Sequence, residues 1–456
     1  MSASSDKLKY GDAIKNKAGA NVSASTAFFL ASEAQKGPLG GSAVPDEYTN
    51  TGLYDIANNL LATDNLFYST SALHGYAESL TTFLNWVDTG AKPSKALDTA
   101  YLNALKDQAA ADNAYWTQLD KAQERYQKSS DMGMVPEGQS FPKWVAAGNF
   151  PQLQTADKAR KAAATTTIGI QSQMAGPMAA QLQGDRTKVE QGLNKDQDLD
   201  GFNMQCAIGN VLSPQELIRR LNNNEEIPKP TIQRLPLYQA PGYKDFVEAA
   251  ERKTGSTYEP ANSIEFSIDT SKNTSDYDFG HTSGSAGVTA GWAPWFFFSS
   301  GASSSTTNTN INTGSESQSV KVKMTYDEMR IVPITLGDWN VDISKYKLRS
   351  DAPKAMKTLA RVHALIVVSG LGYEITVGAQ TASQIDTNYK KTTKAGGRIT
   401  IFGIPIHVGG SGTSTKEVNS HKATWDKASA TFKVVPAQDA GYATVVGVVG
   451  EKFSIL

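Results

Sequence analysis

Cysteine is almost absent from this chain of 456 residues, in which Cys206 is the only one. A single thiol excludes an intramolecular disulfide framework and any metal site built from several thiolates. The surrounding sequence, FNMQCAIGNVL, favours a buried residue that behaves as a small hydrophobe. The alternative is an intermolecular disulfide at Cys206 that links two copies of the chain.

Long hydrophobic runs are also lacking. The best candidates, residues 364–368 and 443–449, have the length of a strand, whereas a membrane-spanning helix needs about 18 apolar residues. Charged residues are scattered through positions 1–30, so we expect no signal peptide. These two absences predict a cytoplasmic protein without a transmembrane helix.

Neither sign of charge is in excess, and the motifs of common enzymes are missing. Lys and Arg number 44, Asp and Glu 45, and the net charge is −1, which provides no field to attract nucleic acid. The chain has no phosphate-binding glycine loop, no zinc-protease motif and no nucleophile elbow. Its 5 histidines share no metal-ligand spacing. We therefore predict a protein that is not an enzyme and has no cofactor, with one reservation about calcium.

That reservation rests on one acidic motif. In DQDLDG, the carboxylates of Asp196, Asp198 and Asp200 alternate and Gly201 follows, as in the first half of an EF-hand loop. The twelfth position of that loop is Ala207, so the bidentate acid that completes calcium coordination is missing. A weak calcium site completed by a partner and a solvated acidic turn both remain open.

The first half of the chain has the periodicity of helices. Apolar residues recur every three or four positions between residues 46 and 225, most clearly over 101–126, where only Asp112 interrupts the apolar face. Apolar positions from Leu60 to Tyr76 predict another helix. Residues 46–225 are therefore predicted to form a helical domain, preceded by a polar N-terminal segment over 1–45.

The sharpest helix start is LSPQELIRRL. Ser213 is a predicted N-cap, Pro214 occupies the first helical position, and Leu212 is placed to pack against Leu217. Several prolines follow and predict a linker with one short helix over residues 226–260.

The period changes to two after the linker. SIEFSID and SVKVKMTY alternate apolar with polar residues, and further runs of this kind are separated by turn residues. The spacing predicts an all-β domain over residues 261–456 that is built as an antiparallel β-sandwich. The fold class predicted for the whole chain is α+β, with a helical-bundle N-terminal half and a β-sandwich-like C-terminal domain.

The most unusual stretch is GWAPWFFFSSGASSSTTNTN. Between Ser283 and Val320 the only charged residue is Glu316. Large rings are gathered at the start of a Ser, Thr and Asn tract: Trp292, Trp295, Phe296, Phe297 and Phe298. Such a cluster has the composition of a binding hot spot, and an uncharged strand lacks the Lys or Pro that blunts a sheet edge.

Three interpretations of this stretch are open. The rings can fill the core of the β domain beside a loose surface loop. Residues 283–320 can also be the insertion hairpin of a β-pore-forming or membrane-active toxin, although between Ser299 and Ser319 only Ala302 and Ile311 are apolar. The third interpretation is self-association, and it is the function we predict, with the toxin as its alternative. The predicted partner is a second copy of the chain, and a membrane only under the alternative.

Three motifs in order, SDYDFG, GWAPWFFFSSGASSS and MRIVPITLGDW, carry a resemblance over residues 275–339. This order resembles a group of fungal and bacterial proteins of similar length, the octin group of octahedral vacuole-crystal proteins of zygomycete fungi and their bacterial relatives. The resemblance implies a structural protein that forms ordered, crystalline assemblies in a vacuole and has no catalytic residues. An oxidising vacuole would suit covalent pairing through Cys206.

Overall fold

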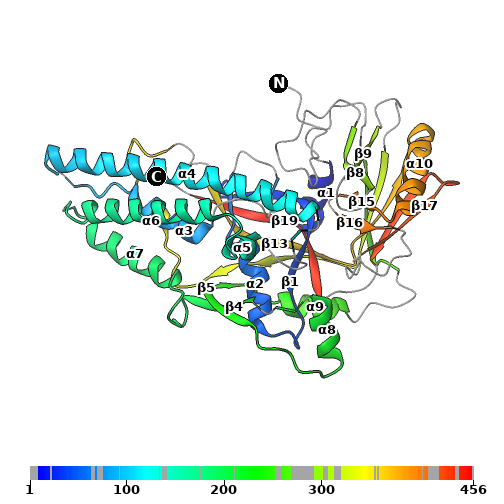
Figure 1. Cartoon of the computed structure of the whole chain (residues 1–456), viewed down its shortest axis with the longest axis horizontal. Coiled ribbons are helices and arrows are strands. Elements are labelled where there is room, and N and C mark those ends of the chain that lie inside the picture. The colour runs from blue at the N-terminus through cyan, green and yellow to red at the C-terminus, as the bar shows by residue number, and fades with distance from the viewer. Residues whose placement is uncertain are drawn as a thin grey trace.

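The computed structural model describes residues 9–453 apart from 21–22, 63–66, 69–74, 92, 133, 136–140, 175, 210, 213, 252–258, 269–291, 301–306, 313–319, 354–355, 357–358, 403, 409–420 and 437–440. Helices and antiparallel sheets both occur, so the chain is an α+β protein as predicted. The molecule is elongated, with long helices at one end, a large sheet in the middle and a second group of sheets at the other end (Figure 1).

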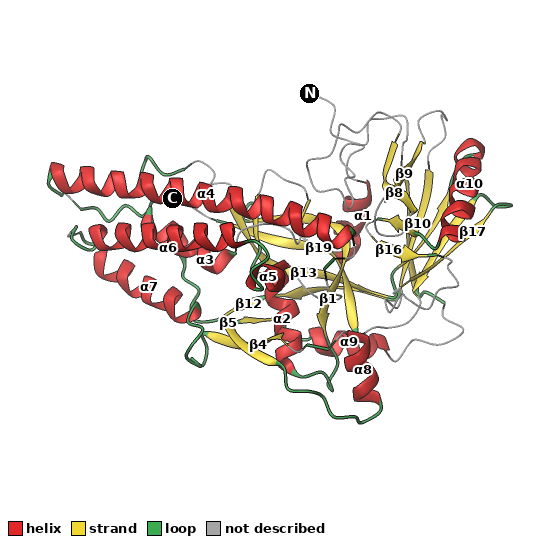
Figure 2. Ribbon diagram, in the orientation of Figure 1, coloured by secondary structure: helices red, strands yellow, loops and turns green. Residues whose placement is uncertain are grey.

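Long helices cover one end of the molecule (Figure 2). The predicted helix over 101–126 is part of α4 (Lys95–Asp131), which packs against α6 (Pro151–Gln171). Around them lie α3 (Tyr76–Asn85), α5 (Phe141–Ala146) and α7 (Ala179–Gly192). Although α4 has 37 residues, neither it nor any other helix in the described part of the chain is long and apolar enough to cross a membrane.

The helix predicted from Leu60 to Tyr76 is wrong. After α2 (Asp46–Ala57) the chain forms two short strands, β2 (Leu60–Ala62) and β3 (Phe67–Tyr68). β2 pairs with β13 (Leu359–Ser369), where the side chains of Leu60 and Leu61 are buried. Pairing with a strand that is distant in the sequence therefore overrides the local apolar spacing.

Part of the N-terminal segment over residues 1–45, which was predicted to be polar, belongs to the core. α1 (Lys9–Ala18) contributes the buried Tyr10 and Ile14, and β1 (Thr26–Leu39) contributes the buried Phe29 and Leu30. β1 pairs in antiparallel fashion with β19 (Tyr442–Lys452), near the other end of the chain. The first strand of the protein is thus held in place by the last.

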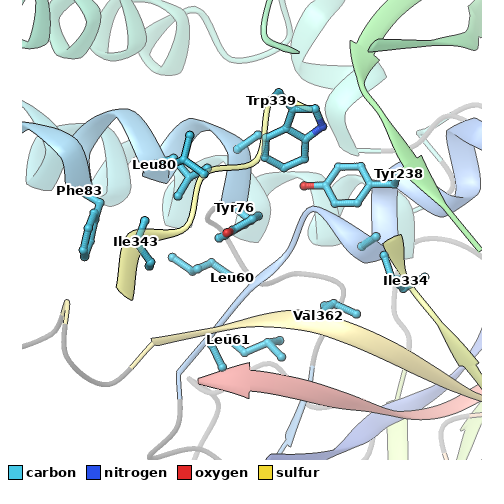
Figure 3. Packing of buried hydrophobic residues seen from close by; sticks show 14 of the residues in the cluster. Leu60, Leu61, Tyr76, Leu80, Phe83, Tyr238, Ile334, Trp339, Ile343 and Val362 are labelled. Atoms are coloured by element: carbon cyan, nitrogen blue, oxygen red, sulfur yellow. The ribbon is translucent and has the colours of Figure 1, made fainter. Parts of the chain in front are cut away.

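The large sheet has the strand order β11-β13-β19-β1-β3, where β11 is Glu328–Pro333. Trp339 belongs to the hydrophobic cluster that this sheet shares with the helices, and it lies beside Tyr238 and Tyr76 (Figure 3). The Trp339 indole N–H donates to the Leu237 carbonyl at 2.9 Å. Its ring lies 5.3 Å from the ring of Tyr238 and 5.8 Å from that of Tyr76. Trp339 therefore buries its ring with its one polar atom satisfied.

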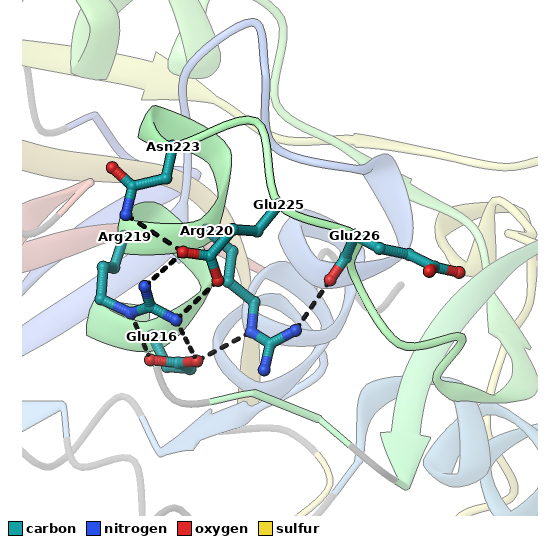
Figure 4. A network of polar contacts seen from close by, with 6 residues as sticks. All are labelled: Glu216, Arg219, Arg220, Asn223, Glu225 and Glu226. Carbon is teal, nitrogen blue, oxygen red and sulfur yellow. Dashed lines mark hydrogen bonds and ion pairs between the residues drawn. The ribbon is translucent and has the colours of Figure 1, made fainter.

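The helix predicted at LSPQELIRRL is α8 (Pro214–Asn222), and Leu217 is buried in a small cluster that Leu212 joins. Ser213, the predicted cap, lies outside the described residues. At the exposed end of α8, Arg219 forms bidentate contacts with Glu216 and with Glu225 (Figure 4). The two arginines beside it, Arg219 first, lower the pKa of Glu216 to about 2.

The Pro-rich segment contains more regular structure than a linker. β5 (Thr231–Pro236) pairs with β4 (Asn203–Gly209), and β6 (Tyr238–Gln239) pairs with β12 (Thr335–Leu336). The prolines permit this because they precede β5 or end it, so no central ladder N–H is lost. The short helix expected after it is α9 (Tyr243–Glu251).

A second, five-stranded sheet has the order β17-β18-β14-β10-β7. Its strands are β7 (Asn262–Ile268), β10 (Val320–Tyr326), β14 (Gly372–Thr376), β17 (His421–Asp426) and β18 (Thr431–Pro436). The alternation predicted for SVKVKMTY is present, since Val320, Val322 and Met324 are buried. β10 is separated from β11 by Asp327 alone, so one stretch of chain contributes to both sheets.

Gly192 tests the packing around Trp339. A Cβ atom at this glycine would lie 2.3 Å from the Cβ of Trp339, which real structures do not allow. We expect Gly192→Ala to lower the free energy of unfolding by about 1–3 kcal/mol through overpacking. Gly184→Ala, on the same helix with open space around it, should instead raise stability by about 0.5–1 kcal/mol. Chemical denaturation of both variants checks this, and equal effects would contradict it.

Candidate functional site

Two long insertions leave the five-stranded sheet. The first joins two strands that are neighbours in the sheet, β7 and β10, whose last pair is Ile268 with Val320. The second leaves β14 after Thr376 and returns at β17; it contains α10 (Ala379–Ala395), β15 (Arg398–Ile401) and β16 (Ile404–His407). The uncharged stretch that the sequence singles out falls almost entirely within the first insertion, residues 269–319.

The two insertions form a sheet of their own. β8 (Trp292–Ser300) and β9 (Thr307–Asn312) come from the first insertion, and the strand order is β16-β15-β8-β9. The junction between the insertions is the antiparallel pairing of β8 with β15, in which Phe298 stands opposite Ile399. This sheet lies at the end of the molecule away from the long helices (Figure 1).

One face of the insertion sheet is packed into the protein. Phe298 is 1% exposed, and the side chains of Ile399 and Ile401 are fully buried. They belong to the same hydrophobic cluster as Val322 and Ile375 of the five-stranded sheet. α10 adds the buried Ile385 to this cluster and packs beside β8 and β9. The two sheets therefore share one core.

The N-terminal helix α1 closes part of this core. The Tyr10 ring stacks on the Phe402 ring at 5.0 Å, and its hydroxyl lies 2.7 Å from that of Tyr373. Burial raises the pKa of both tyrosines, so the pair stays neutral over the physiological range. Phe402 has φ of 46°, a left-handed conformation that is unusual for a bulky residue. α1 thus packs directly against the strained turn of the second insertion.

The structure gives a partial account of the aromatic cluster. Phe298, predicted to be part of a docking face, is instead sealed in the subunit core, because its side chain joins the hydrophobic cluster of the five-stranded sheet and α10. The strand positions of Trp292, Trp295, Phe296 and Phe297 are known, but their side chains lie outside the described residues. β9 is the last strand of its sheet among the described residues.

The acidic turn does not gather its carboxylates. Asp196, Asp198 and Asp200 are all exposed, and Asp198 accepts a hydrogen bond from Gln205 at 3.1 Å. The turn is held by the Asn203 side chain, which donates to two carbonyls and accepts from the Leu199 N–H. Within the part of the chain that the structure describes, no group of three or more His, Cys, Asp or Glu side chains could hold a metal ion.

Cys206 lies on β4 and is fully buried in the main core. Burial, with a smaller contribution from Asp55, raises the pKa of its thiol to about 12. A neutral, inaccessible thiol is a poor nucleophile. This placement supports the favoured interpretation of Cys206 as a small buried hydrophobe and argues against the alternative of an intermolecular disulfide, which would require the core to open.

His421 stands at the point where the second insertion rejoins the sheet. It is the first residue of β17, is 6% exposed, and its Nε2 lies 2.8 Å from the Leu371 carbonyl oxygen. Burial lowers the pKa of this imidazole to about 4, because the charged form would lose its hydration. The sequence offered no signal for this, since His421 shares no spacing with another ligand-type residue.

The depressed pKa of His421 predicts a pH-dependent stability. Unfolded His titrates near 6.5, so the stability that neutral His421 contributes is present above pH 6.5 and is lost as pH falls towards 4, by about 3 kcal/mol. His421→Gln removes the titration, and the difference in unfolding free energy between variant and wild type should follow that window. Asp112, whose pKa burial raises to about 6, contributes the opposite slope in both proteins and cancels in the difference. A difference that is constant with pH would contradict the prediction.

Comparison with known proteins adds no further assignment to this geometry. No protein-family model, no curated protein and no solved structure matches the chain. The function therefore has to be inferred from the residues and arrangement of the chain itself.

Proposed function

We propose that the protein is membrane-active and that residues 269–319 are the hairpin that it inserts. The carrying observation is the pairing of Ile268 with Val320, which places both ends of the insertion at adjacent antiparallel strands. If residues after Ile268 paired with residues before Val320, the antiparallel pair β7–β10 would become longer, and the order of strands in the sheet would stay the same. A closed barrel of such ribbons satisfies every backbone group within a bilayer.

The composition of the insertion supports this role. A barrel strand needs about ten residues to cross a bilayer, and residues 269–319 supply two such strands. The ascending arm alternates Ala286, Val288 and Ala290 with polar residues or glycine. On the descending arm Thr307, Thr309 and Ile311 alternate with three asparagines. The methyl-bearing row would face lipid, and its hydroxyls are the main cost of insertion.

The folded state provides a way to store this hairpin. Before insertion β8 is paired with β15, and Phe298 fills the core that the two sheets share. In this proposal residues 261–456 act as a β-sandwich-like unit that covers the hairpin in solution, beside the helical half. Insertion then requires β8 to separate from β15, and contact with lipid replaces the lost burial of the Phe298 ring.

A disulfide lock between β8 and β15 tests the proposal. Ser299 and Arg398 are opposite each other in the ladder, at a spacing that a disulfide can bridge. We expect the wild type to release dye from anionic liposomes. The oxidised double variant Ser299→Cys with Arg398→Cys should release none, because β8 cannot leave β15.

Reduction provides the internal control for that experiment. The reduced double variant and each single variant should release dye as the wild type does, and buried Cys206 should not interfere. Liposomes that stay intact with wild type between pH 4 and 8 would rule out membrane activity. Equal release by the oxidised lock would show that β8 need not move.

Self-association is the second candidate function, and the position of β9 favours it. β9 ends its sheet in the described part of the chain, and its sequence TNTNIN contains neither the Lys nor the Pro that protects an edge. A second copy could add a strand there. This agrees with the crystalline assemblies that the resemblance to the octin group implies. A barrel also needs several copies, so the two candidates are compatible.

The mass of the protein in solution tests self-association. If copies add strands at β9, light scattering should show a mass that grows with protein concentration. Asn310→Lys places a charge in the centre of β9 and should prevent the growth, whereas Lys433→Gln on β18 should not. Reductant should leave the mass unchanged, because Cys206 is buried. A monomer at every concentration would exclude this candidate.

A further inference from the structure

Arg186 is a buried charge whose hydrogen bonds, among the described residues, all go to uncharged oxygen atoms. It lies on α7 and is 4% exposed. Its Nη2 donates to Asn85 Oδ1 at 2.8 Å, to the Leu84 carbonyl at 3.4 Å and to Gln171 Oε1, all of which are uncharged. Its Nε has no hydrogen-bond partner. Burial lowers the pKa of this guanidinium, and interactions with Tyr101, Glu190 and Tyr346 offset only part of that shift.

The nearest acid along α7 is already neutralised by other groups. Asp185 forms an ion pair with Lys345 at 2.6 Å and accepts a hydrogen bond from the Tyr346 hydroxyl at 2.6 Å. Lys188 Nζ lies 3.8 Å from the other carboxylate oxygen of Asp185. Among the described residues, Asp185 therefore forms no ion pair with Arg186. Burying an unpaired charge lowers the stability of the fold by roughly several kcal/mol.

A cavity of about 270 Å³ adjoins the guanidinium. Its walls contain hydroxyl, amide and small apolar groups and no carboxylate: Thr89, Gln171, Ser172, Ala179, Ala180, Leu182, Gln183 and Arg186. Ala179 and Ala180 lie in the first turn of α7; the Ala179 N–H donates to the Gly176 carbonyl at 3.0 Å, whereas the Ala180 N–H has no acceptor within the helix. The Thr89 hydroxyl accepts from the Ala91 N–H at 3.4 Å, which leaves its own proton to donate.

We propose that this cavity binds a phosphate-type oxyanion, either free or as the headgroup of a phospholipid. Arg186 would supply the positive charge, and the first turn of α7 would supply the Ala180 N–H and the positive end of the helix. An oxyanion with several acceptor oxygens matches donors that converge from more than one wall. The volume exceeds that of inorganic phosphate alone and accommodates a small phosphorylated compound. This site does not depend on the proposed membrane hairpin.

A purely structural role for Arg186 is the competing explanation. The guanidinium joins α3, α6 and α7 through its hydrogen bonds, and Arg186→Gln could simply fail to fold. A better variant is Gln183→Glu, because Gln183 is an exposed residue in the cavity wall. It adds the missing carboxylate and keeps Arg186 in place. Lys188→Gln, which removes an exposed cation from the same helix, is the matched control.

Calorimetric titration with inorganic phosphate, at constant ionic strength, tests the proposal. We expect one site per chain in the wild type and in Lys188→Gln, and at least roughly tenfold weaker binding in Gln183→Glu, because the new carboxylate repels the anion. Without phosphate, Gln183→Glu should also unfold at a higher temperature than the wild type. Absence of phosphate binding by the wild type, or equal binding by Gln183→Glu, overturns the proposal.

Vesicle flotation distinguishes the two sources of phosphate. Wild-type protein is mixed with vesicles of phosphatidylcholine alone and with vesicles that also contain phosphatidic acid. If the headgroup is the ligand, flotation should require phosphatidic acid and be lost in Gln183→Glu, whether or not the β8–β15 lock is closed. If the ligand is soluble, the titration should show binding, and flotation should not differ between wild type and Gln183→Glu.

Discussion

The rest of this structure depends on two places where the chain passes directly from a strand of one sheet to a strand of the other. β10 and β11 are one run of chain divided at Asp327, whose N–H donates to the Ser369 carbonyl at 2.9 Å, at the end of β13. β13 continues after a short turn into β14. The large sheet and the five-stranded sheet are therefore covalently continuous at adjacent strands, with β10 leading into β11 and β13 into β14.

This continuity gives the insertions their setting. Both leave the five-stranded sheet, and they are held by pairing with each other and by a common core. The first insertion has only one charged residue from Ser283 onwards, and its ring at Phe298 is covered by residues from the second insertion and from the sheet. An uncharged strand is an aggregation hazard when its edge is exposed, and the pairing of β8 with β15 covers one edge of this strand. α1 adds a contact at Phe402, where the backbone is strained.

The buried polar groups divide into satisfied and unsatisfied ones. Trp339 has its donor paired, and the two tyrosines that link α1 to β14 pair with each other. Arg186 is different, since its positive charge meets only amides and carbonyls in the described structure. Buried polar groups normally have hydrogen-bond partners. An unsatisfied polar group beside a cavity therefore points to a binding site more directly than one in a closed core.

Local sequence patterns determined much of this protein. The helices α4 and α8, the alternation in β10, the breaks between elements and the uncharged stretch could all be predicted, because they depend on residues two to four positions apart. The tertiary structure alone decided that β1 pairs with β19, that Leu60 lies in a strand, that Phe298 and Cys206 are buried, and that the buried Arg186 Nε has no hydrogen-bond partner. Each of these depends on a partner far away in the sequence, and local periodicity carries no information about such partners.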